Sequence, residues 1–92
     1  MIKTFKDADS QALFQGDRVL RFVNIETVAL RKLAMLNRAA CLDDLRTPPG
    51  NRLERLKGNR ADCYSIRIND QFRLCFQFNQ GDAFNVEIID YH

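Results

Sequence analysis

Six side chains in the second half of the chain have the types and spacing needed to act on a phosphodiester. They are Lys57, Arg67, Arg73, Asp90, Tyr91 and His92. Guanidinium and ammonium groups bind phosphate, and an imidazole with an ordinary pKa of about 6.5 suits proton transfer at neutral pH. RNA supplies its own nucleophile, the 2′-hydroxyl. A basic set with a His or Tyr can therefore cleave RNA with no metal and no cofactor.

The basic side chains also have structural interpretations. Arg73 could clamp a phosphate or form a cross-strand ion pair, for example with Glu87. Arg67 has the same two interpretations. Lys57 precedes Gly58, whose backbone permits close approach of a substrate, but an exposed lysine is an ordinary surface residue.

The three residues at the end of the chain leave similar alternatives open. His92 is the only imidazole, and from the residues alone a disordered last residue is the favoured interpretation. Tyr91 could stack on a base or cover the sheet edge. Asp90 could orient an arginine or the imidazole, or it could be a strand-end carboxylate.

Two runs of alternating apolar and polar residues must position the arginines. Residues 64–69 and 72–78 both have a period of two, which predicts strands with one apolar and one polar face. The polar residues between them, Asn69, Asp70 and Gln71, suit a hairpin turn. This pattern predicts that Arg67 and Arg73 lie together on the open face of a sheet, where they would form an anion site.

A third strand is predicted over residues 83–90, with Phe84, Val86 and Ile88 on its apolar face. Strict alternation then puts Asp90 and His92 on that same face and Tyr91 on the arginine face. A bulge or a turn at the strand end is needed to bring His92 to the anion site.

The first half of the chain predicts the helices that cover this sheet. Residues 2–5 suit a short first strand, and residues 11–15 a short helix with Asp7, Asp9 or Ser10 as N-cap. The clearest helix spans residues 26–40, with a stripe formed by Ala29, Leu33, Leu36 and Ala40. Arg31, Lys32 and Arg38 lie off that stripe or at its margin, which favours a solvated face over a nucleic-acid contact.

Residues 41–51 form a connector in which Leu42 and Leu45 are the expected anchors. Leu53 and Leu56, three apart, suggest a helical turn or an apolar clamp. The order of elements predicts an α+β domain, an antiparallel sheet with the N-terminal helices packed on one face.

The composition limits the possibilities without choosing among them. The length of 92 residues predicts one domain covering 1–92, and a net charge of +2 is too small to identify a nucleic-acid binder. Three cysteines in odd number argue against a disulfide scaffold. No signal peptide or membrane span is evident, so we expect a cytoplasmic protein.

Several segments together resemble the HigB toxins, members of the RelE/ParE superfamily of type II toxin–antitoxin systems. These segments are 56–60 (LKGNR), 64–76 (YSIRINDQFRLCF), 81–83 (GDA) and 86–92 (VEIIDYH). Residues 2–5 (IKTF) and 45–51 (LRTPPGN) are similar to the host-growth-inhibition branch called GraT. The resemblance covers nearly the whole chain and implies a small RelE-like α+β fold.

The resemblance also implies an activity and partners. HigB toxins are ribosome-dependent endoribonucleases that cut mRNA in the ribosomal A site and arrest growth. Their partner is a HigA-type helix-turn-helix antitoxin, and the complex binds its operator DNA mainly through the antitoxin.

By the same resemblance, Lys57 matches the catalytic lysine and Arg73 the phosphate-contacting arginine of these toxins. Asp90, Tyr91 and His92 match their functional C-terminus, and Arg67 the arginine of a Ser-Ile-Arg motif. We therefore expect His92 to be the general base and Lys57 and Arg73 to stabilise the developing charge. The roles of Lys57 and His92 could be exchanged.

Two other functions stay open at this point. The same superfamily includes non-enzymatic poisons of DNA gyrase, which lack the basic catalytic set. A weakly active toxin that mainly binds its antitoxin and tunes transcription is the other alternative.

Overall fold

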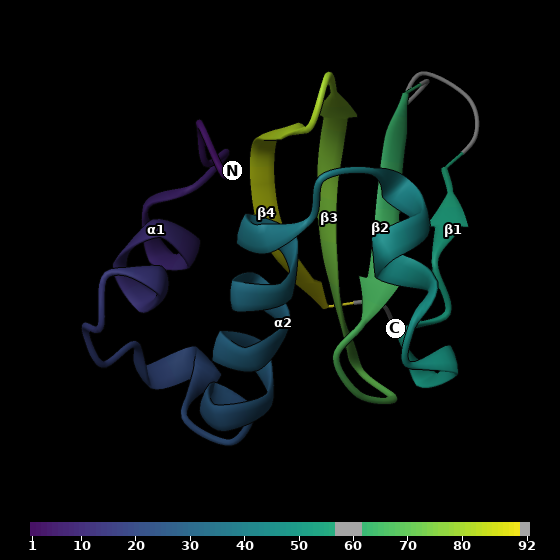
Figure 1. The fold of residues 1–92 in the computed structure, drawn as a ribbon. Helices are drawn as coiled ribbons and strands as arrows, with labels where there is room; N and C mark the ends of the chain where they lie inside the picture. The colour runs from purple at the N-terminus through teal and green to yellow at the C-terminus, as the bar shows by residue number, and fades with distance from the viewer. Residues whose placement is uncertain (57–61, 91–92) are drawn as a thin grey trace.

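The computed structural model describes residues 1–56 and 62–90. Within these ranges the helices are α1 (Ala8–Phe14), η1 (Leu20–Phe22), α2 (Glu26–Arg38), η2 (Leu42–Arg46) and η3 (Pro49–Asn51), where η marks 3₁₀-helices. The strands are β1 (Glu54–Arg55), β2 (Cys63–Arg67), β3 (Phe72–Asn79) and β4 (Asp82–Asp90). They form one antiparallel sheet in the order β1-β2-β3-β4. Figure 1 shows α2 and η2 on one side of this sheet.

The predicted α+β architecture is therefore confirmed, with the helices on one face. The core lies between α2 and the sheet, where Leu33 and Leu36 meet Leu74, Phe76 and neighbouring buried side chains. No helix in the described part of the chain is long and apolar enough to cross a membrane.

Helix α1 begins as its capping residue dictates. The Asp7 side chain accepts a hydrogen bond from the Ser10 backbone N–H at 3.2 Å, as an N-cap should. The buried Ser10 hydroxyl in turn accepts from the Ile88 N–H at 3.0 Å. This bond fixes α1 against β4, near the end of the sheet's last strand.

The N-terminal segment only partly matches the predicted strand. It runs parallel to β4 and contacts it at two isolated bridges, Ile2 with Ala83 and Phe5 with Val86. The strand β1 was not predicted, since two exposed residues, Glu54 and Arg55, carry no alternation. They pair with β2 through the backbone instead.

Helix α2 begins as predicted at Glu26 and buries Ala29, Leu33 and Leu36 of the predicted stripe. It ends at Arg38, two residues earlier than predicted, so that Ala40 lies beyond the helix and is exposed. One expectation about it was wrong. Lys32 is not solvated: only 7% of the residue is exposed, and its ammonium donates to the Asn51 side chain. The lysine is buried because Asn51 in η3, 19 residues later in the chain, supplies a hydrogen-bond acceptor for its ammonium.

The hairpin of β2 and β3 has the predicted turn. Asn69 Oδ1 accepts from the backbone N–H groups of Gln71 at 2.9 Å and Phe72 at 2.7 Å. This local acceptor ends one strand and starts the next. The register then pairs Arg67 with Arg73.

The apolar face predicted for β4 was wrong at Phe84. The register shifts between Cys75 and Gln77 of β3, so that Gln77 pairs with Phe84 but Cys75 pairs with Glu87. Asn85 has a φ of +52°, the left-handed region that asparagine tolerates. The extra residue makes a β-bulge that turns Phe84 to the open face, while Ala83, Val86 and Ile88 face the helices.

Candidate functional site

Two arginines lie opposite each other on the face of the sheet away from the helices. Arg67 on β2 and Arg73 on β3 are paired residues of an antiparallel ladder, and paired residues project to the same side. Like charges directly opposite each other are destabilising. The pair thus creates a site that an anion would stabilise.

Arg73 is the buried member of this pair. Only 8% of it is exposed, so the prediction that the sheet presents it openly was wrong. Its Nε donates to Ser65 Oγ at 2.9 Å, and its Nη2 donates to the carbonyl oxygens of Arg52 at 2.7 Å and Ser65 at 3.4 Å. The carboxylate of Glu54 lies 4.0 Å away. These contacts fix the orientation of the guanidinium fork.

Arg67 is the more accessible member, with 34% of its side chain exposed. Its guanidinium donates to Asp70, whose side chain is almost fully in solvent. An ion pair of this kind is strongly screened by water and contributes little. A phosphate could therefore replace the Asp70 carboxylate as the partner of the Arg67 guanidinium at a low cost in free energy.

Arg73 donates to the carbonyl oxygen of Arg52, which with Asn51 forms a two-residue corner of the chain before β1. Lys32 binds the same corner from the helical side of the sheet. Asn51, next to Arg52, is fully buried. It accepts from the Lys32 ammonium and donates to the carbonyl oxygen of Leu45 at 3.1 Å. Lys32 on the helical side and Arg73 on the other side of the sheet therefore bind the adjacent residues 51 and 52.

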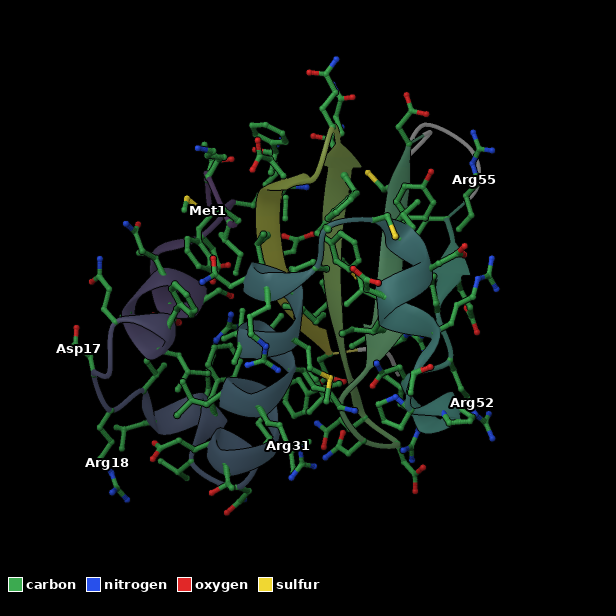
Figure 2. The ribbon with its side chains drawn as sticks, in the orientation of Figure 1. Met1, Asp17, Arg18, Arg31, Arg52 and Arg55 are labelled. Carbon is green, nitrogen blue, oxygen red and sulfur yellow. The ribbon has the colours of Figure 1, made fainter. Side chains whose placement is uncertain are left out.

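The surroundings of this corner are electropositive. The pKa of Lys32 is lowered by burial first, and then by the positive charges of Arg31 and Arg67. In Figure 2, Arg31 and Arg52 lie toward the same, lower end of the molecule. Lys32 therefore lies within electrostatic range of two further cations.

The structure locates three of the six predicted site residues. It brings Arg67 and Arg73 together. Asp90 pairs with Phe72 on the helix-facing side, and its carboxylate accepts from Gln71 Nε2 at 2.9 Å. The other three, Lys57, Tyr91 and His92, lie outside the described residues.

Sequence reasoning missed the residues that orient the arginine. Ser65 lies two residues before Arg67 in the same alternating run, so its shared face was available as a signal. The roles of Lys32 and Asn51 had no such signal, because their contact joins α2 to η3 across the fold.

In the described part of the chain, a four-stranded antiparallel sheet with N-terminal helices on one face is consistent with a small RelE-like domain. The chain belongs to the HigB-like toxin family: residues 3–92 match the RelE-like toxin of type II toxin–antitoxin system HigB. Membership in a type II family implies an antitoxin as partner.

Curated relatives agree with this assignment. The chain is 42% identical over 87 residues to Toxin HigB-1 of Vibrio cholerae, a match covering 92% of each chain. It is also 42% identical over 41 residues to Endoribonuclease HigB of Proteus vulgaris, a match covering 45% of each chain.

Proposed function

We propose that the chain is an endoribonuclease that cuts mRNA at the ribosome and thereby arrests translation and growth. The observation that carries the proposal is the pairing of the accessible Arg67 with the buried Arg73 on the face of the sheet away from the helices. A phosphate bound beside this pair would reduce the repulsion between the two positive charges and gain charge-assisted hydrogen bonds. The name of the Proteus vulgaris relative, Endoribonuclease HigB, supports the same activity.

The reaction needs a base, an acid and charge stabilisation. His92 would take the proton from the 2′-hydroxyl, whose oxygen then attacks the adjacent phosphorus. The P–O5′ bond breaks, leaving a 2′,3′-cyclic phosphate, and the departing 5′-oxygen takes a proton from solvent. Lys57 and Arg73 would stabilise the negative charge that develops on the phosphate oxygens. Tyr91 would stack on or orient a base, Asp90 would position its neighbours, and Arg67 would bind the RNA backbone.

The contacts of Arg73 support a fixed rather than a mobile charge. Three oxygens of Ser65 and Arg52 hold its fork in one orientation. A preorganised donor needs no rearrangement when charge develops, which is why such donors contribute strongly to catalysis.

The proposed partners follow from the same function. They are mRNA in the ribosomal A site, a HigA-like helix-turn-helix antitoxin, and operator DNA bound through the toxin–antitoxin complex. All three would place the protein in the cytoplasm.

Single-turnover cleavage of mRNA on programmed ribosomes tests the proposal. We expect wild-type protein to cleave, His92→Ala and Lys57→Ala each to slow the chemical step by far more than a few-fold, and Arg67→Ala to weaken RNA binding. Arg18→Ala is the matched control, because Arg18 is an exposed arginine in the helical half of the chain. Wild-type protein that leaves mRNA intact but inhibits DNA supercoiling by gyrase would overturn the proposal.

A further inference from the structure

Beyond the arginine pair, the open face of the sheet carries an aromatic ring that the core does not use. The bulge at Asn85 turns Phe84 to this face, opposite Gln77. Among the described residues, Phe84 is neither in the core nor packed against it. Bulges often occur next to active sites, where they redirect a side chain. Without this bulge, alternation would put the Phe84 ring against the helices. With it, the ring lies half-buried on the polar face of the sheet.

Next to this ring, two amides are joined to each other. Asn85 Nδ2 donates to Gln77 Oε1 at 2.5 Å, so the two side chains span β4 and β3. The direction of that bond leaves the Gln77 amide nitrogen as a donor and the Asn85 oxygen as an acceptor. A donor beside an acceptor matches the edge of a nucleobase, which also presents one of each.

The surface around these amides is hollowed on both sides. One hollow of about 410 Å³ is lined by Phe84, Gln77 and Asn79, with Asp62 and Phe78. The other, of about 320 Å³, shares Gln77 and is lined by Asn85, Glu87, Lys6, Cys63, Cys75 and Phe76. Phe84 therefore borders one hollow and Asn85 the other, and Gln77, which lies on the same face of the sheet as Arg73, borders both.

We propose that Phe84 and the amide pair of Gln77 and Asn85 form a subsite for one unpaired base of single-stranded RNA. Phe84 supplies a face on which any base can stack, and the amides hydrogen-bond its edge. The proposal rests on the function proposed above and adds a point of contact remote from the cleaved bond.

The spacing along β3 separates this subsite from the arginine pair. Gln77 is four residues from Arg73, which at the strand rise of about 3.4 Å per residue is roughly 14 Å. The base in this subsite therefore belongs to a flanking nucleotide, and the cleaved phosphate lies at the arginine pair.

Titration of ¹⁵N,¹³C-labelled full-length protein with 2′-O-methyl hexanucleotides, which cannot be cleaved, tests the subsite directly. We expect saturable shifts of the Phe84 ring protons and of the side-chain amides of Gln77 and Asn85. Phe84→Ala should weaken binding by roughly tenfold, the loss typical of one stacked base. Phe84→Trp should restore it.

Two further variants separate the parts of the subsite from the fold. Asn85→Gly keeps the left-handed bulge, because glycine adopts positive φ freely, but removes the amide. It should weaken binding and change the relative affinities for A, C, G and U hexanucleotides. Leu20→Ala removes an exposed apolar side chain from η1 and serves as the control, with binding unchanged.

The outcomes distinguish the subsite from the proposed function. If wild-type protein cleaves mRNA on ribosomes but the hexanucleotides leave the resonances of Phe84 and the amide pair unmoved, the subsite is wrong and the function stands. If those resonances shift and Phe84→Ala weakens binding, but no mRNA is cleaved, the subsite stands and the function is wrong. A wild-type protein that neither binds nor cleaves RNA overturns both.

Discussion

The two faces of the sheet each hold a buried cation, and the cations differ in how their charge is satisfied. Lys32 reaches from the helical layer to a single side-chain oxygen of Asn51. Arg73 lies on the open face and donates to three oxygens, one of them the carbonyl of Arg52. The two cations thus bind neighbouring residues, Asn51 and Arg52, of the same corner.

The difference teaches which cation is suited to function. A lysine with one neutral acceptor has a lowered pKa, because burial penalises its charged form. An arginine remains charged under all ordinary conditions, and its planar fork can bind several oxygens at once. The helical face thus uses its cation to connect elements, whereas the open face holds a permanent positive charge in a fixed orientation.

Loss of Arg73 should have the largest effect. We expect Arg73→Ala to reduce mRNA cleavage by roughly 10²- to 10³-fold, the loss seen when one preorganised donor to a developing charge is removed. It should also lower the free energy of unfolding by about 2–4 kcal/mol, since Ser65 and Arg52 lose a buried charged donor. Single-turnover cleavage and urea unfolding measure the two effects.

The adjacent residue on the other face is the control for that experiment. Leu74 is fully buried against the helices, so Leu74→Ala should cost about 2–5 kcal/mol of stability. The protein that remains folded should cleave at the wild-type rate. Equal losses of cleavage per folded molecule in both variants would contradict the distinction between the two faces.

The core face was the part that the sequence predicted well. The stripe of α2 and the alternation of β2 and β3 are local periodic signals, and they place Leu33, Leu36, Leu74 and Phe76 correctly. Hairpin geometry then brings Arg67 opposite Arg73 without further information.

The features that failed depend on contacts between distant segments. Lys32 is buried because Asn51, 19 residues later, supplies an acceptor. Phe84 changes face because the bulge at Asn85 inserts one residue into the ladder, and a single inserted residue reverses every side chain on one side of it. The alternation of apolar and polar residues in a sequence does not show where a β-bulge will interrupt the strand.

Loss of Asn51 should have the next largest effect. Asn51→Ala leaves the Lys32 ammonium without its acceptor and the Leu45 carbonyl without its donor, so we expect a cost of about 2–4 kcal/mol. Urea unfolding measures the cost. A double-mutant cycle with Lys32→Met then isolates the contact, and a coupling energy near zero would show that the lysine does not hold this corner.

The lowered pKa of Lys32 predicts a smaller effect that depends on pH. Below the folded-state pKa both states carry the proton, and burial of the ammonium is a constant cost. Between that pKa and the unfolded value of 10.5, the unfolded chain binds more protons than the folded one, so stability rises with pH. Wild type should therefore gain stability relative to Lys32→Met as the pH approaches 10.5, and a flat difference would contradict the assignment.

Substitution of Asp44 should have the smallest effect on stability, because this exposed residue binds only the start of the connector 41–51. Its carboxylate accepts from the backbone N–H groups of Ala40 at 2.9 Å and Cys41 at 3.3 Å, and these bonds lower its pKa below 3.8. The contribution is present above pH 3.8 and is lost as the pH falls through the lowered pKa. Asp44→Asn should destabilise slightly at pH 7 and not at all once the wild-type carboxyl is protonated.

The neighbouring Asp43 is the matched control, since it bonds to the side chain of Arg46 rather than to the backbone. Asp43→Asn removes the same charge from the same 3₁₀-helix. If the two variants lose equal stability at pH 7, net charge explains the effect. If Asp44→Asn loses more, the backbone bonds hold the start of η2, and with it the path of the chain to the corner that Lys32 and Arg73 share.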